Sequence, residues 1–134
     1  MIEWEERYAT GNESIDRQHK FLFNMFNDFG VCIKSGEGQH FVVNSFPLLE
    51  SYTKAHFAFE EECMDQHKCS SFSENKEAHQ DFLRKIKHFQ TQFNLGQRDD
   101  IVVQMHSFIE EWITVHIMTV DLHLKSCIKN KENS

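Results

Sequence analysis

The chain has few helix-breaking residues and no long apolar run. One proline and five glycines among 134 residues leave room for long, uninterrupted helices. No stretch approaches the ~20 consecutive apolar residues that span a bilayer, so we expect no membrane insertion. The N-terminal sequence MIEWEERYAT lacks a basic region followed by an apolar stretch, so we expect no secretory signal and a cytoplasmic protein.

Positive charge is also scarce. The chain carries 14 Lys and Arg against 21 Asp and Glu, a formal net charge of −7. Binding to nucleic acid needs clustered Lys and Arg, so we expect no nucleic-acid partner. The length suits one domain with its own hydrophobic core, and we predict a single domain over residues 1–134.

The four cysteines include no CxxC pair. In a cytoplasmic chain the usual state is the reduced thiol, and we predict that state here. The alternative is a redox role, for which Cys63 or Cys69, beside an expected loop, is the candidate.

Apolar residues recur at alternating spacings of three and four, the pattern of packed helices. The pattern predicts helices over residues 16–34, 41–66, 73–93 and 99–128, separated by short breaks. Four helices with short connections favour an all-α fold, an antiparallel up-down-up-down four-helix bundle. Asp16 and Ser73 are the expected N-caps of the first and third helices.

The two ends of the chain do not show this pattern. We expect residues 1–14 to form an N-terminal arm that packs on the bundle through Trp4 and Tyr8. Residues 129–134 are a polar tail or the start of a linker. Within the bundle we expect a phenylalanine-rich core that includes Phe23, Phe26, Phe59, Phe82 and Phe89.

Several polar residues occupy positions that the helical pattern reserves for apolar ones. Burying such groups without partners costs roughly a few kcal/mol each, and more for a charge. They are His19 in the first helix, His56 and Glu60 in the second, Asn75 and His79 in the third, and His116 in the fourth. In an antiparallel bundle these positions fall at the same end, in about one layer, together with Asp121.

Imidazoles and carboxylates that converge in one layer predict a metal site. Each residue alone has a simpler explanation: a single buried histidine usually packs and hydrogen-bonds, and His56 with Glu60 could be a surface pair. Asp121 fits less well, because five residues of α-helix turn its side chain about 140° away from that of His116. Either a π-type bulge narrows this angle, or the metal lies between the two directions, or Asp121 is an exposed charge.

The ordered motifs resemble the hemerythrin family over nearly the whole chain. They are IDRQHK (15–20), HFAFEE (56–61), NKEAH (75–79) and WITVHIMTVD (112–121), and Trp4 and Gly11 in the arm also match. The resemblance implies a bacterial hemerythrin-like domain with two non-haem iron ions that bind O2 or another small diatomic or anionic ligand. The irons would be carboxylate-bridged, with an oxo or hydroxo bridge when oxidised.

The resemblance also implies a role for each residue. Glu60 and Asp121 would bridge the irons, His19 and His56 would hold the iron at which oxygen binds, and His79 and His116 would hold the other. Trp112 would lie close to the irons, and Ile113 would line the ligand pocket. No catalytic residue is implied.

Asn75 departs from the family pattern, which has a fifth histidine at this position. An amide is a poorer iron ligand than imidazole. Three alternatives follow: the position is open or filled by water, Asn75 binds weakly through its oxygen, or His67 folds back to replace the histidine. His40, His88, His106 and His123 are interpreted as surface or packing residues.

Three functions fit such a site. The first is an oxygen or redox sensor that regulates a fused or partner signalling module, such as a diguanylate cyclase or a chemotaxis receptor, because hemerythrin-like domains are often fused to them. The second is oxygen storage or delivery. The third is an enzyme that reduces O2, peroxide or NO, which the histidine-rich ligand set disfavours.

Overall fold

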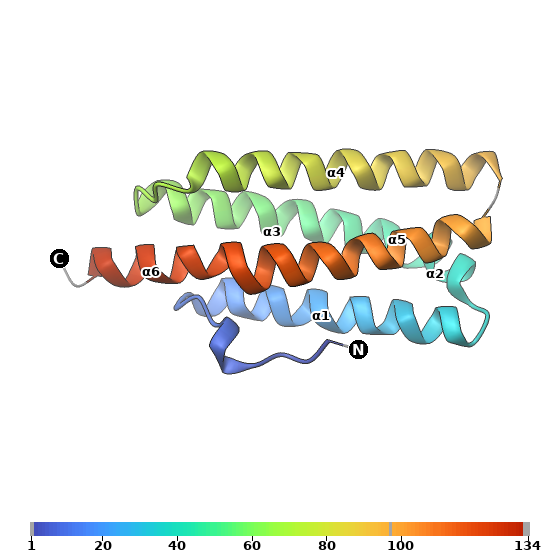
Figure 1. The fold of residues 1–134 in the computed structure, drawn as a ribbon, viewed down its shortest axis with the longest axis horizontal. Helices are drawn as coiled ribbons and strands as arrows, with labels where there is room; N and C mark the ends of the chain where they lie inside the picture. Colours follow the sequence, from blue (N-terminus) through green and yellow to red (C-terminus); the bar gives the residue numbers. More distant parts are fainter. Residues whose placement is uncertain (1, 97, 133–134) are drawn as a thin grey trace.

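In the computed structural model every regular element of the described residues is helical (Figure 1). The structure describes residues 2–96 and 98–132, with the backbone alone at residues 118–122 and 129–132. The elements are the 3-10 helix η1 (Glu6–Tyr8), α1 (Glu13–Lys34), α2 (Gly38–Asn44), α3 (Phe46–Gln66), α4 (Phe72–Leu95), α5 (Arg98–Trp112), the π-helix η2 (Ile113–Val120) and α6 (Asp121–Glu132). The predicted all-α class is confirmed.

The long helices lie lengthwise beside one another (Figure 1). Helices α5, η2 and α6 follow one another as a single rod, which lies beside α1, α3 and α4. Among the described residues, no helix is long and apolar enough to cross a bilayer.

The helix expected over residues 41–66 is in fact two helices. Helix α2 ends at Asn44, and α3 begins at Phe46, immediately before Pro47. Proline cannot donate a backbone hydrogen bond and disfavours helical geometry in the residue before it, so a helix starts at Pro47 more readily than it passes through it.

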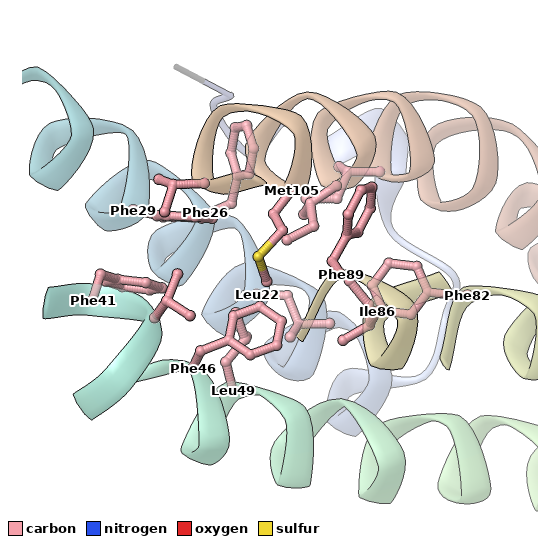
Figure 2. Close-up of a cluster of buried hydrophobic side chains, with 14 of the residues drawn as sticks. Leu22, Phe26, Phe29, Phe41, Phe46, Leu49, Phe82, Ile86, Phe89 and Met105 are labelled. Atoms are coloured by element: carbon pink, nitrogen blue, oxygen red, sulfur yellow. The ribbon is translucent and has the colours of Figure 1, made fainter. Parts of the chain in front are cut away.

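The predicted apolar face of each long helix is buried in one core (Figure 2). Its phenylalanine side chains interleave between the helices, as in the stacked pair Phe29 and Phe41, whose ring centroids are 4.6 Å apart. Phe23, Phe26, Phe82 and Phe89 are buried as expected. The expectation for Phe59 was wrong: this residue is 38% exposed, because it faces away from the seam that His56, Glu60 and Cys63 occupy on the same helix.

The N-terminal arm packs on α1 through the two predicted aromatic residues. The rings of Trp4 and Tyr8 lie 5.8 and 6.1 Å from that of Phe23. The arm turns into α1 at Gly11, whose positive φ of 93° suits glycine.

The expected N-caps were wrong. Asn12 caps α1 by accepting a hydrogen bond from the backbone of Ile15, and α1 therefore begins before Asp16. Asp16 instead accepts hydrogen bonds from the backbone and hydroxyl of Thr10, which tie the arm to the first turn. Ser73 lies inside α4, whose cap position is Ser71.

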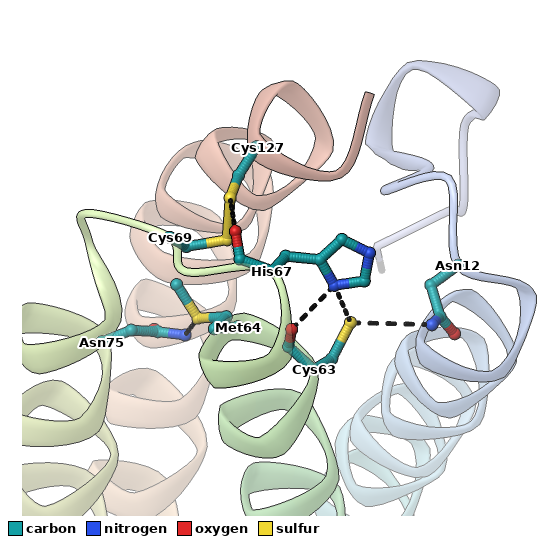
Figure 3. Close-up of a disulfide and its surroundings, with 7 residues drawn as sticks. All are labelled: Asn12, Cys63, Met64, His67, Cys69, Asn75 and Cys127. Carbon is teal, nitrogen blue, oxygen red and sulfur yellow. Dashed lines mark hydrogen bonds between the residues drawn. A yellow bond between two sulfur atoms is a disulfide. The ribbon is translucent and has the colours of Figure 1, made fainter. Parts of the chain in front are cut away.

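Two cysteines form a disulfide, so the prediction that all thiols are reduced was wrong. Cys69, just after α3, pairs with Cys127 in α6, with their Cα atoms 5.7 Å apart (Figure 3). Cys32 and Cys63 are free. The paired residues are separated by 58 positions, so only the packing of α6 against the α3–α4 turn brings them within bonding distance.

Candidate metal centre

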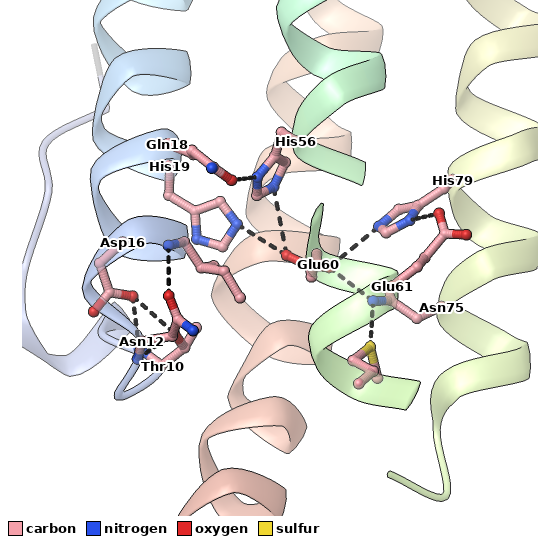
Figure 4. Close-up of polar contacts among 12 residues, drawn as sticks. Thr10, Asn12, Asp16, Gln18, His19, His56, Glu60, Glu61, Asn75 and His79 are labelled. Carbon is pink, nitrogen blue, oxygen red and sulfur yellow. Dashed lines mark hydrogen bonds and ion pairs between the residues drawn. The ribbon is translucent and has the colours of Figure 1, made fainter. Parts of the chain in front are cut away.

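Glu60 lies at the centre of the layer of buried polar residues, and histidines from three helices surround it (Figure 4). The Nε2 atoms of His19 and His56 lie 3.3 and 3.4 Å from Oε2 of Glu60. On the other side, Nε2 of His79 lies 3.3 Å from Oε1 of the same carboxylate. The two oxygens of one carboxylate therefore face different histidines.

The donor atoms form two groups that share Glu60. One group is His19, His56 and Glu60, and the other is Glu60, His79 and His116; within each, all ligand atoms lie within 4.8 Å of one another. We call them the Oε2 group and the Oε1 group. The structure thus brings together five of the side chains that the sequence places in one layer. Imidazole with carboxylate is a donor set that suits divalent transition metals.

Helix geometry explains how each group forms. His56 and Glu60 are four residues apart in α3, which places them on one face. In the rod of α5, η2 and α6, the π-helix η2 surrounds His116. Hydrogen bonds in a π-helix join residues five apart, so position 121 follows His116 by about one turn of backbone. A π-type segment, which one of the alternatives for this segment requires, is therefore present. The side chain of Asp121 lies outside the described residues.

Two residues that the sequence analysis did not assign orient the imidazoles. Nδ1 of His56 lies 2.6 Å from Oε1 of Gln18 and donates to it. Nδ1 of His79 lies 2.8 Å from Oε2 of Glu61 and donates to it. Such hydrogen bonds fix the tautomer and turn Nε2 toward the site, which is the usual arrangement behind a metal-binding histidine. The sequence could have suggested this role, since Gln18 and Glu61 are directly adjacent to the predicted ligands His19 and Glu60.

The pKa shifts favour neutral imidazoles at His56 and His116 and a charged carboxylate at Glu60. Burial lowers the pKa of His56 from 6.5 to about 3, despite the opposing charge of Glu60. Burial, and then the charge of His79, lowers the pKa of His116 from 6.5 to about 4. Burial alone would raise the pKa of Glu60, but interactions with His19 and His79 hold it well below its ordinary value of 4.5.

These states test whether a cation fits the site. Neutral His56 donates its one N–H to Gln18, so its Nε2 presents a lone pair to Oε2 of Glu60, 3.4 Å away. Two lone-pair donors that face each other in a buried site repel, and a cation between them reverses the interaction. The donor set therefore fits a bound metal ion.

Asn75 adds a hydrogen-bond donor to the same carboxylate. Its Nδ2 donates to Oε1 of Glu60 at 2.7 Å and to Sδ of Met64 at 3.0 Å. Its Oδ1 is buried and has no hydrogen-bond partner within the described part of the chain. The alternative that His67 replaces a ligand here was wrong, because Nδ1 of His67 lies 2.9 Å from the backbone oxygen of Cys63, where the ring caps the end of α3 (Figure 3).

Aromatic rings enclose the Oε1 group. The ring of Phe57 stacks on His79 with centroids 3.9 Å apart, and Trp112 stacks on His116 at 4.2 Å. His106 is a packing residue, stacked on Phe26 at 4.4 Å, and His40, His88 and His123 are exposed, as expected.

An apolar cavity of about 30 Å³ lies next to the donor layer. Leu22, Thr53, Phe82 and Ile113 line it, and each is one helical turn from a histidine of the site, on α1, α3, α4 and η2 respectively. Trp112, Ile109, Ile117, Phe26, Phe46, Leu49, Glu50, Leu83 and Ile86 complete the lining. The cavity therefore lies about one helical turn from the donor layer, and the site histidines themselves are not among its lining residues.

The chain is similar in sequence to known proteins. The model of the hemerythrin HHE cation binding domain matches residues 10–128. A bacteriohemerythrin of Stenotrophomonas maltophilia is 26% identical over 117 residues, which cover 87% of this chain and 74% of the relative. A bacteriohemerythrin of Pseudomonas aeruginosa is 27% identical over 118 residues, covering 88% and 75%. A hemerythrin of Siphonosoma cumanense is 30% identical over 122 residues, covering 91% and 89%. The chain thus belongs to the hemerythrin family.

Proposed function

We propose that the chain is a non-haem di-iron domain that binds dioxygen and acts as an oxygen or redox sensor. The observation that carries this proposal is the position of Glu60: His19 and His56 lie beside its Oε2, His79 lies beside its Oε1, and His116 completes the second donor group. In this proposal Glu60 would contribute to the binding of both irons. His19 and His56 would hold one of them, and His79 and His116 would hold the other.

Asp121 is proposed as the second bridging carboxylate, since η2 brings its backbone position about one turn after His116. The antiparallel up-down-up-down four-helix bundle is the topology that we propose for the long helices. It accounts for the common layer, because donors near the start of α1 and α4 then meet donors near the end of α3 and of the last rod.

Iron bound here supplies the reversible binding of O2. The surrounding residues of the chain control what reaches the site. The apolar cavity, lined at its metal end by Trp112 and Ile113, favours small neutral molecules and excludes ordered water, since a water needs polar partners. Gln18 and Glu61 keep the imidazoles in the tautomer that presents Nε2 to the metal.

Asn75 supports a sensor rather than a store. At its position an imidazole would add a lone-pair donor, whereas the Asn75 amide donates a hydrogen bond to Glu60. The proposed second iron then has fewer protein ligands and exchanges its remaining ligands readily. A centre of this kind oxidises easily to the diferric state, which suits a signal passed to a fused or partner module better than lasting oxygen carriage.

The test is metal analysis with visible absorption of the reduced protein before and after exposure to air. Two irons per chain, with the absorption of an oxo-bridged or oxygenated centre after air, are expected. Glu60→Gln should lose both, while Glu62→Gln, an exposed neighbour on α3, should keep both. A wild-type protein that takes up no iron under these conditions overturns the proposal.

Oxygen storage is the competing function, and the apolar cavity would serve it equally well. The two functions differ in the lifetime of the oxygenated form. Rapid conversion to the diferric form in air is expected of the sensor. An oxygenated form that persists for hours would favour storage.

A further inference from the structure

The Cys69–Cys127 disulfide lies at the end of the bundle that carries the metal centre (Figure 3). It belongs to a small apolar cluster, separate from the main core, that also contains Ile15, Cys63, Met64, Leu124 and Ile128. Cys69 is buried, with 7% of its surface exposed, whereas Cys127 is only partly buried. Cys127 is therefore the more exposed half of the disulfide.

Cys69 occupies a specific position in the turn that ends α3. The backbone N–H groups of Lys68 and Cys69 donate to the oxygens of Asp65 and Met64, at 3.1 and 2.9 Å. This is a Schellman motif, in which the residue at the position of Lys68 adopts a left-handed conformation. Lys68 has a φ of 54°, which costs a residue with a side chain about 1 kcal/mol more than it would cost glycine. The turn is therefore held by tertiary contacts, of which the disulfide is the covalent one.

The disulfide is also the covalent link between this turn and α6. Among the described side chains of α6, Leu124 and Ile128 are buried against the small cluster. Sγ of Cys127 lies 3.7 Å from the backbone oxygen of His67, which places α6 directly against the turn. The first residue of α6 is Asp121, so the same helix carries the proposed second bridging carboxylate at its other end.

A chain of direct contacts joins the disulfide to Glu60. The N–H of Cys69 donates to the backbone oxygen of Met64, and Sδ of Met64 accepts from Asn75 at 3.0 Å. Asn75 donates in turn to Oε1 of Glu60 at 2.7 Å. The position of the turn is thus coupled to the Oε1 group by one backbone bond and two side-chain bonds.

We propose that Cys69–Cys127 is a reversible redox site that a dithiol reductant opens, releasing α6 from the α3–α4 turn. A thiolate of the reductant attacks Sγ of Cys127, and the Cys69 sulfur leaves as a thiolate and takes up a proton. The second thiol of the reductant then attacks the mixed disulfide and releases Cys127 as a thiol. Two electrons and two protons pass to the protein, and the reductant ends as its own disulfide.

Reduction leaves each thiol in a tolerable environment. Cys69 remains in the apolar cluster, where a buried cysteine behaves as a small hydrophobic residue. The Cys127 thiol can donate to the backbone oxygen of His67, which already lies 3.7 Å away. Cys63 takes no part, because burial raises the pKa of its thiol and makes it a poor nucleophile.

The test measures hydrogen exchange of the metal-free protein in its oxidised form and after incubation with dithiothreitol, with the thiols counted by alkylation. We expect native-state reduction that adds two thiols per chain to the two free ones. We also expect amide exchange in α6 to rise by about tenfold or more, while exchange in the middle of α1 stays unchanged. Air or oxidised dithiothreitol should restore the original pattern.

Matched variants separate the disulfide from the other cysteines. Cys127→Ser should show the fast exchange of α6 with or without reductant, whereas Cys63→Ser should respond as the wild type does. If dithiothreitol reduces the disulfide only when the protein unfolds, the disulfide is purely structural and the proposal is overturned. So would complete native reduction with no change in the exchange of α6.

A second measurement links the redox site to the metal centre, and this arm alone rests on the proposed function. Loss of Co²⁺ to a chelator should be several times faster from reduced protein than from oxidised protein. Equal rates would remove the coupling but leave the redox site supported by the exchange data. Failure to bind Co²⁺ or iron at all would count against the proposed function, while the thiol and exchange results would still decide the redox site.

Discussion

The Oε2 group and the Oε1 group share one carboxylate but are built differently. His19 and His56 project from regular α-helices, α1 and α3. His79 and His116 belong to α4 and to the π-helix η2, and two aromatic rings stack on them. The Oε2 group is thus held by the bundle itself, whereas the Oε1 group depends on an irregular segment and on the helix that follows it.

Asn75, where the sequence resemblance leads us to expect a histidine, lies on the same side. Asn75 donates to Oε1 of Glu60, and through Met64 it contacts the turn that carries Cys69. The comparison shows that the π-helix and the Asn75 hydrogen bonds both belong to the Oε1 half of the site. We expect changes of ligand set and redox state to act on the Oε1 group and to leave the Oε2 group largely as it is.

The largest expected effect is on stability at acidic pH, and it comes from both groups. The pKa values of His56 and His116 are about 3 and about 4 in the folded protein, below the ordinary 6.5. Between these values the unfolded chain binds more protons than the folded one, so the contribution to stability is complete above pH 6.5 and is lost as the pH falls. Each histidine contributes a slope of at most about 1.4 kcal/mol per pH unit.

Urea unfolding of the metal-free protein between pH 7.5 and 4.5 measures this slope. His56→Gln should reduce it, and His123→Gln, on the surface, should leave it unchanged. His116 should take up a proton at a higher pH than His56, because its pKa is the higher of the two. Stability that does not change over this range would contradict the neutral, buried imidazoles.

The next effect is on metal affinity, and it should differ between the two groups when the hydrogen-bond acceptor behind one of their histidines is removed. Gln18→Ala removes the acceptor behind His56, and Glu61→Ala removes the one behind His79. Loss of such a partner typically weakens metal binding by about 10- to 100-fold. Competition with a chelator should show one weakened ion per chain in each variant and the other ion unaffected.

Glu62→Gln is the control for the second of these variants, since it changes an exposed carboxylate beside Glu61. Equal weakening of both ions by either variant would mean that the two groups do not bind independently.

The smallest effect concerns Asn75. Asn75→His supplies an imidazole to the Oε1 group and should slow both metal loss and oxidation in air, by several-fold, a factor that corresponds to about 1 kcal/mol. Asn75→Ala removes the hydrogen bond to Glu60 without adding a ligand and should not slow oxidation. Absorbance recorded during exposure to air compares the three proteins. Oxidation of Asn75→His at the wild-type rate would show that Asn75 does not govern this lability.

Much of the fold could be predicted from the sequence, because the buried positions of a helix are apolar and recur at a regular spacing. The alternating spacing of three and four identified the buried faces, and residues such as Leu49, Ile86 and Met105 lie in the core as that spacing predicts. The same spacing made the polar exceptions visible. His19, His56, Glu60, His79 and His116 stand in that pattern and are all buried beside one another. Their roles as iron ligands stay predictions, to be decided by metal analysis.

Local chemistry accounts for the boundaries that were missed. Pro47 starts a new helix after Asn44, and Asn12 rather than Asp16 caps α1. Several neighbouring residues could begin or cap each of these helices. The spacing of apolar residues does not show which of them does so.

The order of residues along the chain was enough to predict the long helices, apart from the break before α3, and to place four imidazoles and the Glu60 carboxylate in one layer, because helix geometry relates positions three and four apart. Contacts between distant segments needed the folded molecule. They include the division of histidines between the two oxygens of Glu60, the hydrogen bonds of Gln18 and Glu61, and the pairing of Cys69 with Cys127 across 58 residues. Such contacts depend on how helices rotate and slide against one another, and the packing of the whole core sets that arrangement.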